Sequence, residues 1–279
     1  MIVPAAQAMP TVTPQSHSLM PLLFGERHLR RAARQCMRRR SSPGADRLTW
    51  SGYRQGFDER IGLLSDRLRQ GSWRPGPVRE VPIVLFTGKV MMAVIPTVED
   101  RIVQRAMRNC IEPVLEARAF RDFVSGYRPR RNRMTAVAQA AGYYARGCHW
   151  VADVDVRDVS GGASLDGVIG WLSRWITDGT FLSRVRTALA DLPHPIVPGT
   201  GLAPVLINLR LVPVDGALAC HQVIRFCDNY CLFTRTEADA VTAFAEVEGA
   251  LAQIGLQPAL GKSRVHGHMN PEDLFMIAG

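Results

Sequence analysis

Apolar residues recur at helical spacing in the first half of the chain. They predict helices over residues 26–40, 56–70 and 102–115. The third helix has the clearest pattern, because its apolar stripe follows Thr97, a residue typical of helix N-caps, and the acidic Glu99 and Asp100. Before it, residues 78–95 alternate and are rich in β-branched side chains around Thr87 and Gly88. This segment predicts a β-hairpin.

Helical and strand patterns alternate in the second half. The expected helices cover residues 134–146, 167–175, 181–192 and 237–254. The expected strands are residues 150–156, a pair over 223–234 with Asp228 and Asn229 at its turn, and a short strand at 274–277. No glycine-rich phosphate loop and no internal repeat interrupts this order. The pattern indicates an α+β protein.

Composition adds an expectation about partners. The 279 residues are 47% hydrophobic, enough for a substantial core, and carry a net charge of +9 with a pI near 9.8. Such a surplus points first to nucleic acid and second to an anionic membrane surface. No apolar run is long enough for a transmembrane helix. Residues 1–25 carry no Lys or Arg and are dotted with Pro, Thr, Ser and Gln, which does not fit a secretory signal, and we expect a flexible tail on a cytoplasmic protein.

The six cysteines contain no CxxC pair, which favours reduced, buried thiols. Cys227 and Cys231 have a spacing that could suit zinc, but no second pair of ligands accompanies them.

Two aspartates on separate predicted strands are the main candidates for chemistry. Asp155 ends an apolar-alternating run, and Asp228 lies between apolar residues, where an unpaired carboxylate is costly. Two carboxylates held by separate strands are what a two-metal phosphoryl-transfer site needs, because magnesium prefers oxygen ligands and two such ions lie about 3.5–4 Å apart. Taken singly, either aspartate is more typical of a cap or an ion pair.

Eight short motifs occur in the order found in bacterial reverse transcriptases of the group II intron maturase type, over nearly all of residues 26–279. The chain resembles that family most closely at residues 95–104 (IPTVEDRIVQ) and 125–129 (SGYRP). The other motifs are at residues 43–46 (PGAD), 71–79, 150–156 (WVADVDV), 199–211, 225–229 (RFCDN) and 255–264.

The resemblance implies a right-hand polymerase, an RNA-directed DNA polymerase with a fingers-like region at residues 26–124 and a palm-like region at 125–279. The palm would be an antiparallel sheet packed on helices. The family's thumb is expected to be absent, because the chain stops just past the palm. By the same resemblance, Asp155, Asp228 and the carbonyl of Val156 would bind Mg²⁺ or Mn²⁺, and Asn229 would occupy the second catalytic position of the turn.

The resemblance also assigns substrate contacts. Lys89 would meet the incoming triphosphate, and Lys262 would act near the pyrophosphate leaving group. Ser160, Gly199 and Arg128 also fall on motif positions near the substrate. The implied partners are an RNA template, a nucleic-acid primer, dNTP or rNTP, and a partner protein that supplies a thumb.

Several positions depart from the family pattern. Met91 replaces a fingers arginine, Pro198 a glutamine, Gly161 an acidic residue and Asn229 the second aspartate of the turn. Ser160 replaces the bulky aromatic residue that blocks a ribose 2′-hydroxyl, so discrimination against ribonucleotides should be poor. Two hypotheses follow: an RNA-directed polymerase, or an inactive pseudo-polymerase or decayed intron fragment that binds RNA or a protein partner.

Overall fold

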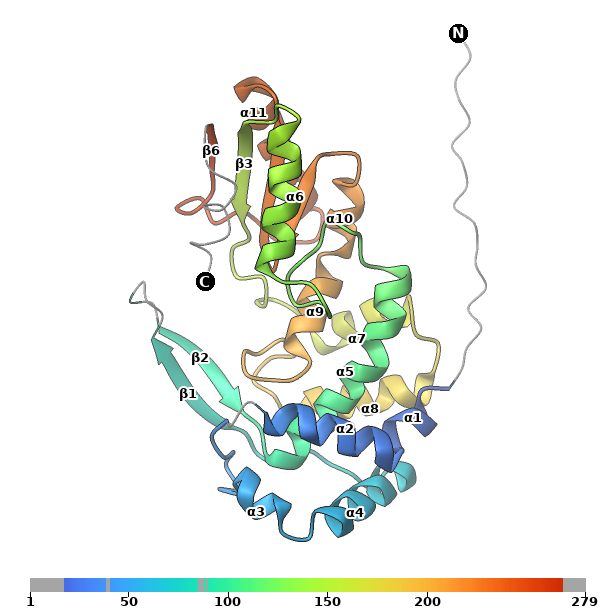
Figure 1. Ribbon diagram of the computed structural model, residues 1–279. Helices are drawn as coiled ribbons and strands as arrows, with labels where there is room; N and C mark the ends of the chain where they lie inside the picture. Colours follow the sequence, from blue (N-terminus) through green and yellow to red (C-terminus); the bar gives the residue numbers. More distant parts are fainter. Residues whose placement is uncertain (1–17, 39–40, 85–87, 89, 268–279) are drawn as a thin grey trace.

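The computed structural model describes residues 18–38, 41–84, 88 and 90–267. The N-terminal half consists of helices and one hairpin, which projects to one side of them (Figure 1). Its elements are α1 (Met20–Phe24), α2 (Glu26–Met37), α3 (Trp50–Arg54), α4 (Phe57–Gln70), β1 (Arg79–Val84), β2 (Val90–Ile95) and α5 (Val98–Arg118).

The C-terminal half combines helices with a four-stranded sheet. Its elements are α6 (Arg133–Ala145), β3 (Trp150–Asp155), α7 (Leu165–Ser173), α8 (Gly179–Ala190), α9 (Ala203–Arg210), α10 (Val212–Ala217), β4 (Val223–Phe226), β5 (Asn229–Thr234), α11 (Glu237–Ala252) and β6 (Arg264–Gly267). The chain is thus a mixed helical and antiparallel-sheet protein, as its pattern predicts.

Helix α5 forms where the sequence predicts it. The Thr97 hydroxyl accepts a hydrogen bond from the Asp100 amide at 3.2 Å and donates one to the Asp100 carboxylate at 2.7 Å, which caps the first turn. Most of the apolar stripe of α5 is buried, and Ile102 and Met107 are fully so. This helix is therefore the centre of the largest core.

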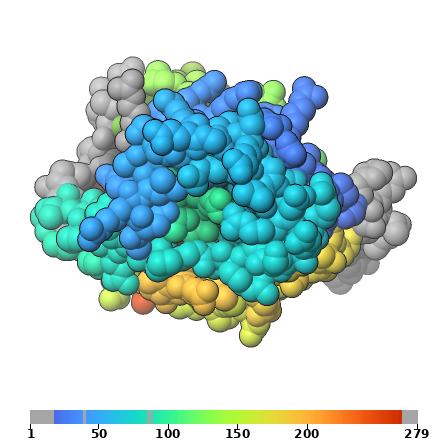
Figure 2. Space-filling model, turned by 90° about the horizontal axis from the view of Figure 1, so that it is seen from below, coloured from blue at the N-terminus to red at the C-terminus, as the bar shows by residue number. Residues whose placement is uncertain are grey.

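That core contains α1, α2, α4 and α5 together with α7, α8 and α9. It therefore includes residues from both sides of the predicted boundary at residue 124, and the division into two regions stays a prediction. Figure 2 shows the underside of the molecule, where the N-terminal half of the chain makes up most of the surface.

The sheet has the strand order β4-β5-β3-β6, and all neighbours are antiparallel. Side chains alternate between its faces. Ala152 and Val154 of β3 face α11, whereas Val151 belongs to the cluster that β4 and β5 form with α6 (Figure 1). Asp153 and Asp155 consequently point to the α6 side.

The β4–β5 hairpin differs from the prediction by one residue. Phe226 pairs with Asn229, so the turn residues are Cys227 and Asp228, and Asn229 is the first residue of β5. Cys227 adopts a φ of 57°, which closes a two-residue turn. Thr87 of the expected β1–β2 turn, residues 1–17 of the tail and the strand at 274–277 lie outside the described residues.

No helix within the described ranges is long and apolar enough to cross a membrane. The six cysteines, all of them described, form no disulfide.

Candidate functional site

Asp155 lies at the end of β3, where the main chain is fixed on both sides. Its amide donates to the Ser263 hydroxyl at 3.1 Å, and its carbonyl accepts from the Ala259 amide at 2.8 Å. The carboxylate remains 20% exposed, and the Lys262 ammonium lies 3.8 Å from it. Asp155 and Lys262, distant in sequence, are therefore neighbours.

Asp228 occupies the β4–β5 turn next to the end of β3. Its carbonyl accepts a hydrogen bond from the Val156 amide at 3.1 Å, which joins the turn to β3. Burial raises the pKa of the Asp228 carboxyl, and the negative charge of Asp155 raises it further. The two predicted carboxylates thus lie close enough to repel each other, an arrangement that a cation would stabilise.

The protein donors suit a hard cation. Within the described ranges, no three His, Cys, Asp or Glu side chains are grouped as a metal site. The donors that the sequence predicts are the carboxylates of Asp155 and Asp228 and the main-chain carbonyl of Val156, all oxygen atoms. Mg²⁺ typically takes one or two protein carboxylates and fills its other positions with water and phosphate oxygens. The donor set fits magnesium in this respect.

The buried side chain of Arg225 supports the β4–β5 turn. Its guanidinium is fully buried and forms two hydrogen bonds with Asp215, at 2.7 and 2.6 Å. It also donates to the Asn208 side chain at 2.8 Å and to the Cys227 carbonyl at 2.7 Å. Burial alone would lower the pKa of Arg225, but the charge of Asp215 raises it above its usual value, so this arginine is charged. The pattern of apolar and polar residues gave no sign of this buried ion pair.

Three curated proteins show what the chain is similar to. The group II intron-encoded protein LtrA of Lactococcus lactis subsp. cremoris is 29% identical over 169 residues, 57% of this chain and 28% of that protein. The putative COX1/OXI3 intron 1 protein of Saccharomyces cerevisiae is 24% identical over 169 residues, 57% of this chain and 20% of its own length.

This chain is a distant relative of group II intron-encoded proteins. A shorter match, 35% identical over 91 residues, joins 33% of the chain to 24% of protein YkfC of Escherichia coli strain K12. No protein-family model matches. The chain spans only 20–28% of the length of these curated relatives.

Asn229, expected at the turn but found as the first residue of β5, carries an amide that is already engaged. Asn229 lies directly opposite Asp155 in the β3–β5 register. Its Nδ2 donates to Asp153 Oδ1 at 2.9 Å, and its Oδ1 accepts from the Cys231 thiol at 3.3 Å. Asp153 is not among the predicted site residues, although its position two residues before Asp155 places it on the same face of the strand.

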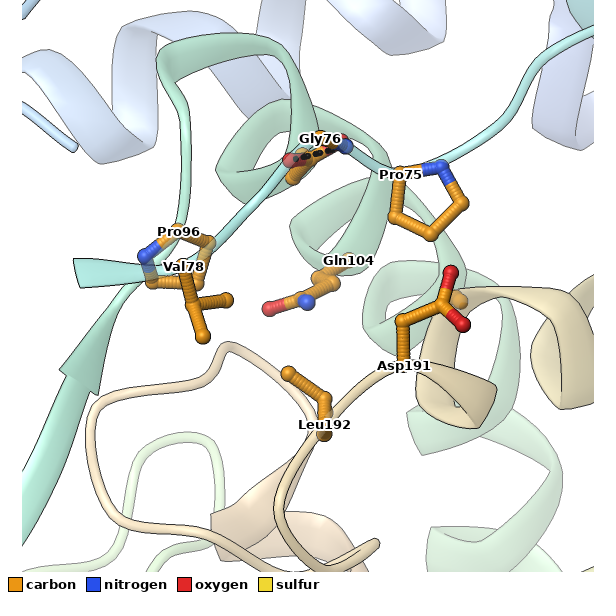
Figure 3. Close-up of a pocket in the computed structure, with 9 residues that line it drawn as sticks. Pro75, Gly76, Val78, Pro96, Gln104, Asp191 and Leu192 are labelled. Carbon is orange, nitrogen blue, oxygen red and sulfur yellow. Dashed lines mark hydrogen bonds between the residues drawn. The ribbon is translucent and has the colours of Figure 1, made fainter. Parts of the chain in front are cut away.

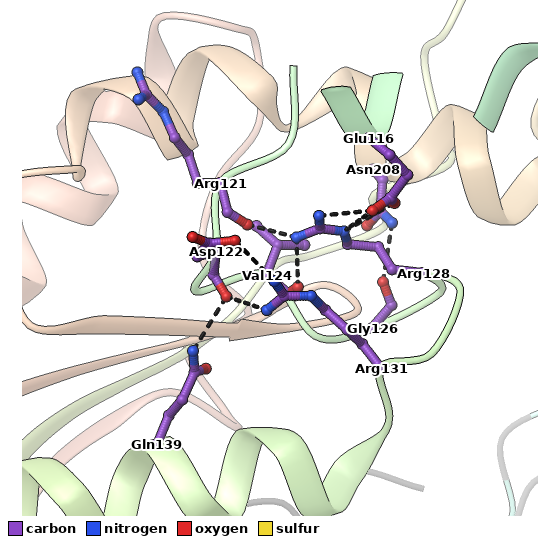
Figure 4. A network of polar contacts seen from close by, with 9 residues as sticks. All are labelled: Glu116, Arg121, Asp122, Val124, Gly126, Arg128, Arg131, Gln139 and Asn208. Atoms are coloured by element: carbon purple, nitrogen blue, oxygen red, sulfur yellow. Dashed lines mark hydrogen bonds and ion pairs between the residues drawn. The ribbon is translucent and has the colours of Figure 1, made fainter. Parts of the chain in front are cut away.

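Arg128, predicted to contact substrate, is buried in a polar network (Figure 4). Its guanidinium holds both carboxylate oxygens of Glu116, with the shortest contact at 2.8 Å, and donates to the carbonyls of Arg121 at 2.5 Å and Val124 at 2.9 Å. It therefore joins α5 to the loop that leads towards α6. A direct contact with substrate stays a prediction.

Ser160 lies in a tight loop after β3. Its hydroxyl donates to Asp158 Oδ1 at 3.2 Å, and the Gly161 amide donates to the same oxygen at 3.1 Å. A Cβ at Gly161 would come 2.0 Å from Asp158 Oδ2, so a side chain here would require the Asp158 carboxylate to move. The Arg210 guanidinium holds the loop through the Val159 and Gly161 carbonyls, at 2.9 and 2.6 Å.

Gly199 packs directly on the hairpin. Its φ is 99°, and a Cβ there would come 2.0 Å from the Val94 carbonyl oxygen of β2. The Val94 amide donates to the Pro198 carbonyl at 2.9 Å, so this loop and the hairpin support each other. A small pocket opens near the base of the hairpin, between Pro96, Gln104 and Leu192 (Figure 3). Lys89 lies outside the described residues.

Proposed function

We propose that this chain is a reverse-transcriptase-like, RNA-directed polymerase unit that carries out nucleotidyl transfer with two metal ions. In this proposal α2 to α5 and the β1–β2 hairpin are the fingers, and the four-stranded sheet is the palm. The observation that carries the proposal is the meeting of Asp155 and Asp228 beside Lys262, at the joined ends of β3 and the β4–β5 turn. Distant homology to intron-encoded proteins supports the same class.

Each residue of this site has a definable task. Asp155, Asp228 and the Val156 carbonyl would hold Mg²⁺ or Mn²⁺, which when bound would stabilise the charge of the attacking and leaving oxygens. Lys262, with an ammonium group that is largely exposed beside Asp155, would bind phosphate oxygens of the nucleotide. Ser160 is too small to exclude a 2′-hydroxyl, so both dNTP and rNTP would be accepted. The net charge of +9 would hold the RNA template and the primer.

A second function, RNA binding without catalysis, is favoured by one observation. Asn229, directly after the turn, contributes no charge to the site, and both ends of its amide are hydrogen-bonded, to Asp153 and Cys231. A pseudo-polymerase of this kind would keep the fold and the basic surface while losing turnover.

Primer extension separates the two functions. We would supply an oligo(dT) primer on a poly(rA) template with dTTP or UTP, in Mg²⁺ or Mn²⁺. Asp155→Asn and Asp228→Asn should abolish incorporation. Asp66→Asn, on the exposed face of α4, is the matched control and should retain it. Incorporation that is the same in all four proteins would eliminate catalysis by this chain.

RNA affinity tests the second function. Because arginine–phosphate contacts release counterions, the Kd for single-stranded RNA should rise steeply between about 50 and about 200 mM salt. Absent extension with salt-sensitive binding would establish the pseudo-polymerase. RNA binding that does not change with salt would count against both proposed functions.

A further inference from the structure

Asp153 is a buried carboxylate with few donors around it. The residue is 9% exposed and lies on β3, two positions before Asp155 on the same face of the sheet. Its Oδ1 accepts from Asn229 Nδ2 at 2.9 Å and from the Cys231 thiol at 3.7 Å, and its Oδ2 lies 3.8 Å from His266 Nε2. Of these contacts, only the one from Asn229 has the length of a normal N–H···O hydrogen bond.

This geometry makes residue 229 the principal donor to Asp153. Asp153 Oδ1 is an acceptor in this arrangement, and leaving a buried acceptor without a donor is costly. The Asn229 amide is well oriented for the task, because its Oδ1 receives the Cys231 thiol at 3.3 Å and its Nδ2 is thereby turned towards Asp153. An aspartate at position 229 would place a second hydrogen-bond acceptor against the carboxylate of Asp153.

We infer that Asp153 is a positioning residue: it requires an amide at 229 and holds the first residue of β5, and with it the neighbouring Asp228. On this view the amide of Asn229, which follows the turn residue Asp228, is matched to Asp153 and is not simply the loss of a carboxylate. Asp153 would thus support the metal-binding turn without touching the metal. The consequence for metal binding rests on the proposed function, whereas the hydrogen-bond requirement does not.

A reciprocal exchange tests the requirement. Asn229→Asp alone should lower the Tm by about 5 °C or more at neutral pH without metal, because two buried acceptors then face each other. In the double variant Asp153→Asn, Asn229→Asp the donor and the acceptor change places, and most of the lost Tm should return. Asn132→Asp, which adds the same charge at an exposed N-cap, is the matched control and should change the Tm by no more than about 2 °C.

Metal binding tests the positioning role separately. Asp153→Ala removes the partner of Asn229 and should weaken Mn²⁺ binding by about tenfold, as outer-shell substitutions commonly do. Asp153→Asn keeps an acceptor for the Asn229 amide and should bind Mn²⁺ nearly as the parent does. Electron paramagnetic resonance of free Mn²⁺ measures both.

The outcomes separate this inference from the proposed function. If Asn229→Asp is as stable as the parent, or if the double variant recovers nothing, the inference is overturned. If the parent binds no Mn²⁺, the proposed function fails, and the Tm series alone still decides whether Asp153 requires the amide.

Discussion

Asp155 and Asn229 face each other directly across the β3–β5 pair, and the Asp228 carbonyl accepts from the next amide of the chain, that of Val156. The register therefore places three polar positions of two separate motifs at one end of the sheet. If either strand shifted by one residue relative to the other, its side chains would move to the opposite face of the sheet. The position of the candidate site thus depends on sheet register as much as on residue type.

Replacing Asp228 should stabilise the metal-free protein. Burial and the charge of Asp155 disfavour the ionised form of Asp228, so Asp228→Asn should raise the Tm by about 2–4 °C near neutral pH. Added Mg²⁺ should raise the Tm of the parent but not that of the variant. Thermal unfolding with and without Mg²⁺ measures both effects. A variant less stable than the parent without metal would show that the two carboxylates do not repel.

Breaking the buried Arg225–Asp215 ion pair beside the β4–β5 turn should strongly destabilise the protein. Arg225→Met leaves Asp215 buried without its partner, and we expect a loss of about 3–5 kcal/mol in the free energy of unfolding. Arg131→Met is the matched control, because the partner of Arg131, Asp122, is 95% exposed, and its loss should be below about 1 kcal/mol. Urea unfolding of both variants checks this. Equal losses would mean that Arg225 contributes no more than a surface arginine.

Local pattern is enough to locate most of the fold. Helix α5 has an apolar stripe and a capping threonine, and β3 has strict alternation, so both are visible in a short window of sequence. The roles of Asp153 and Arg225 are not visible in this way. Their partners, Asn229 and Asp215, are 76 and 10 residues away, and the contacts exist only once strand pairing and helix packing have formed.

The same distinction applies to the substrate residues suggested by motif position. Asp155 and Lys262 do come together. Arg128 and Gly199 instead show structural contacts, because a buried guanidinium needs acceptors and a positive φ favours glycine. A motif shows which residue type occurs at a position. It does not distinguish a residue that contacts a ligand from one that stabilises the fold.

Gly199→Ala should loosen the contact between its loop and the hairpin. The added Cβ would meet the Val94 carbonyl, and the backbone would keep a φ of 99° that alanine tolerates poorly, so the Tm should fall by about 4 °C or more. Gly216→Ala, within α10 and with open space around it, should be neutral or stabilising. Limited proteolysis of the hairpin should be faster in the first variant only. Unchanged cleavage would show that the loop around Gly199 does not support the β1–β2 hairpin.

The cap at Asp178 should make stability depend on pH in the acidic range. Burial raises the pKa of this carboxyl, but hydrogen bonds from Phe181, Ser18, Leu19 and Met20 outweigh it and lower the pKa below its usual value of 3.8. Stability from a lowered pKa is present above the unfolded value and is lost as pH falls through the folded one.

Asp178→Ala should therefore lower the Tm by about 3–6 °C at pH 7, and the difference should shrink only below about pH 4. Asp66→Ala, an exposed aspartate of α4, should show a small difference that hardly depends on pH. Thermal unfolding at intervals between pH 7 and pH 3 measures the two curves. If the Asp178 curve converges with that of the parent well above pH 4, the hydrogen bonds to the N-terminal segment do not lower the pKa, and α1 is not held to α8 through this carboxylate.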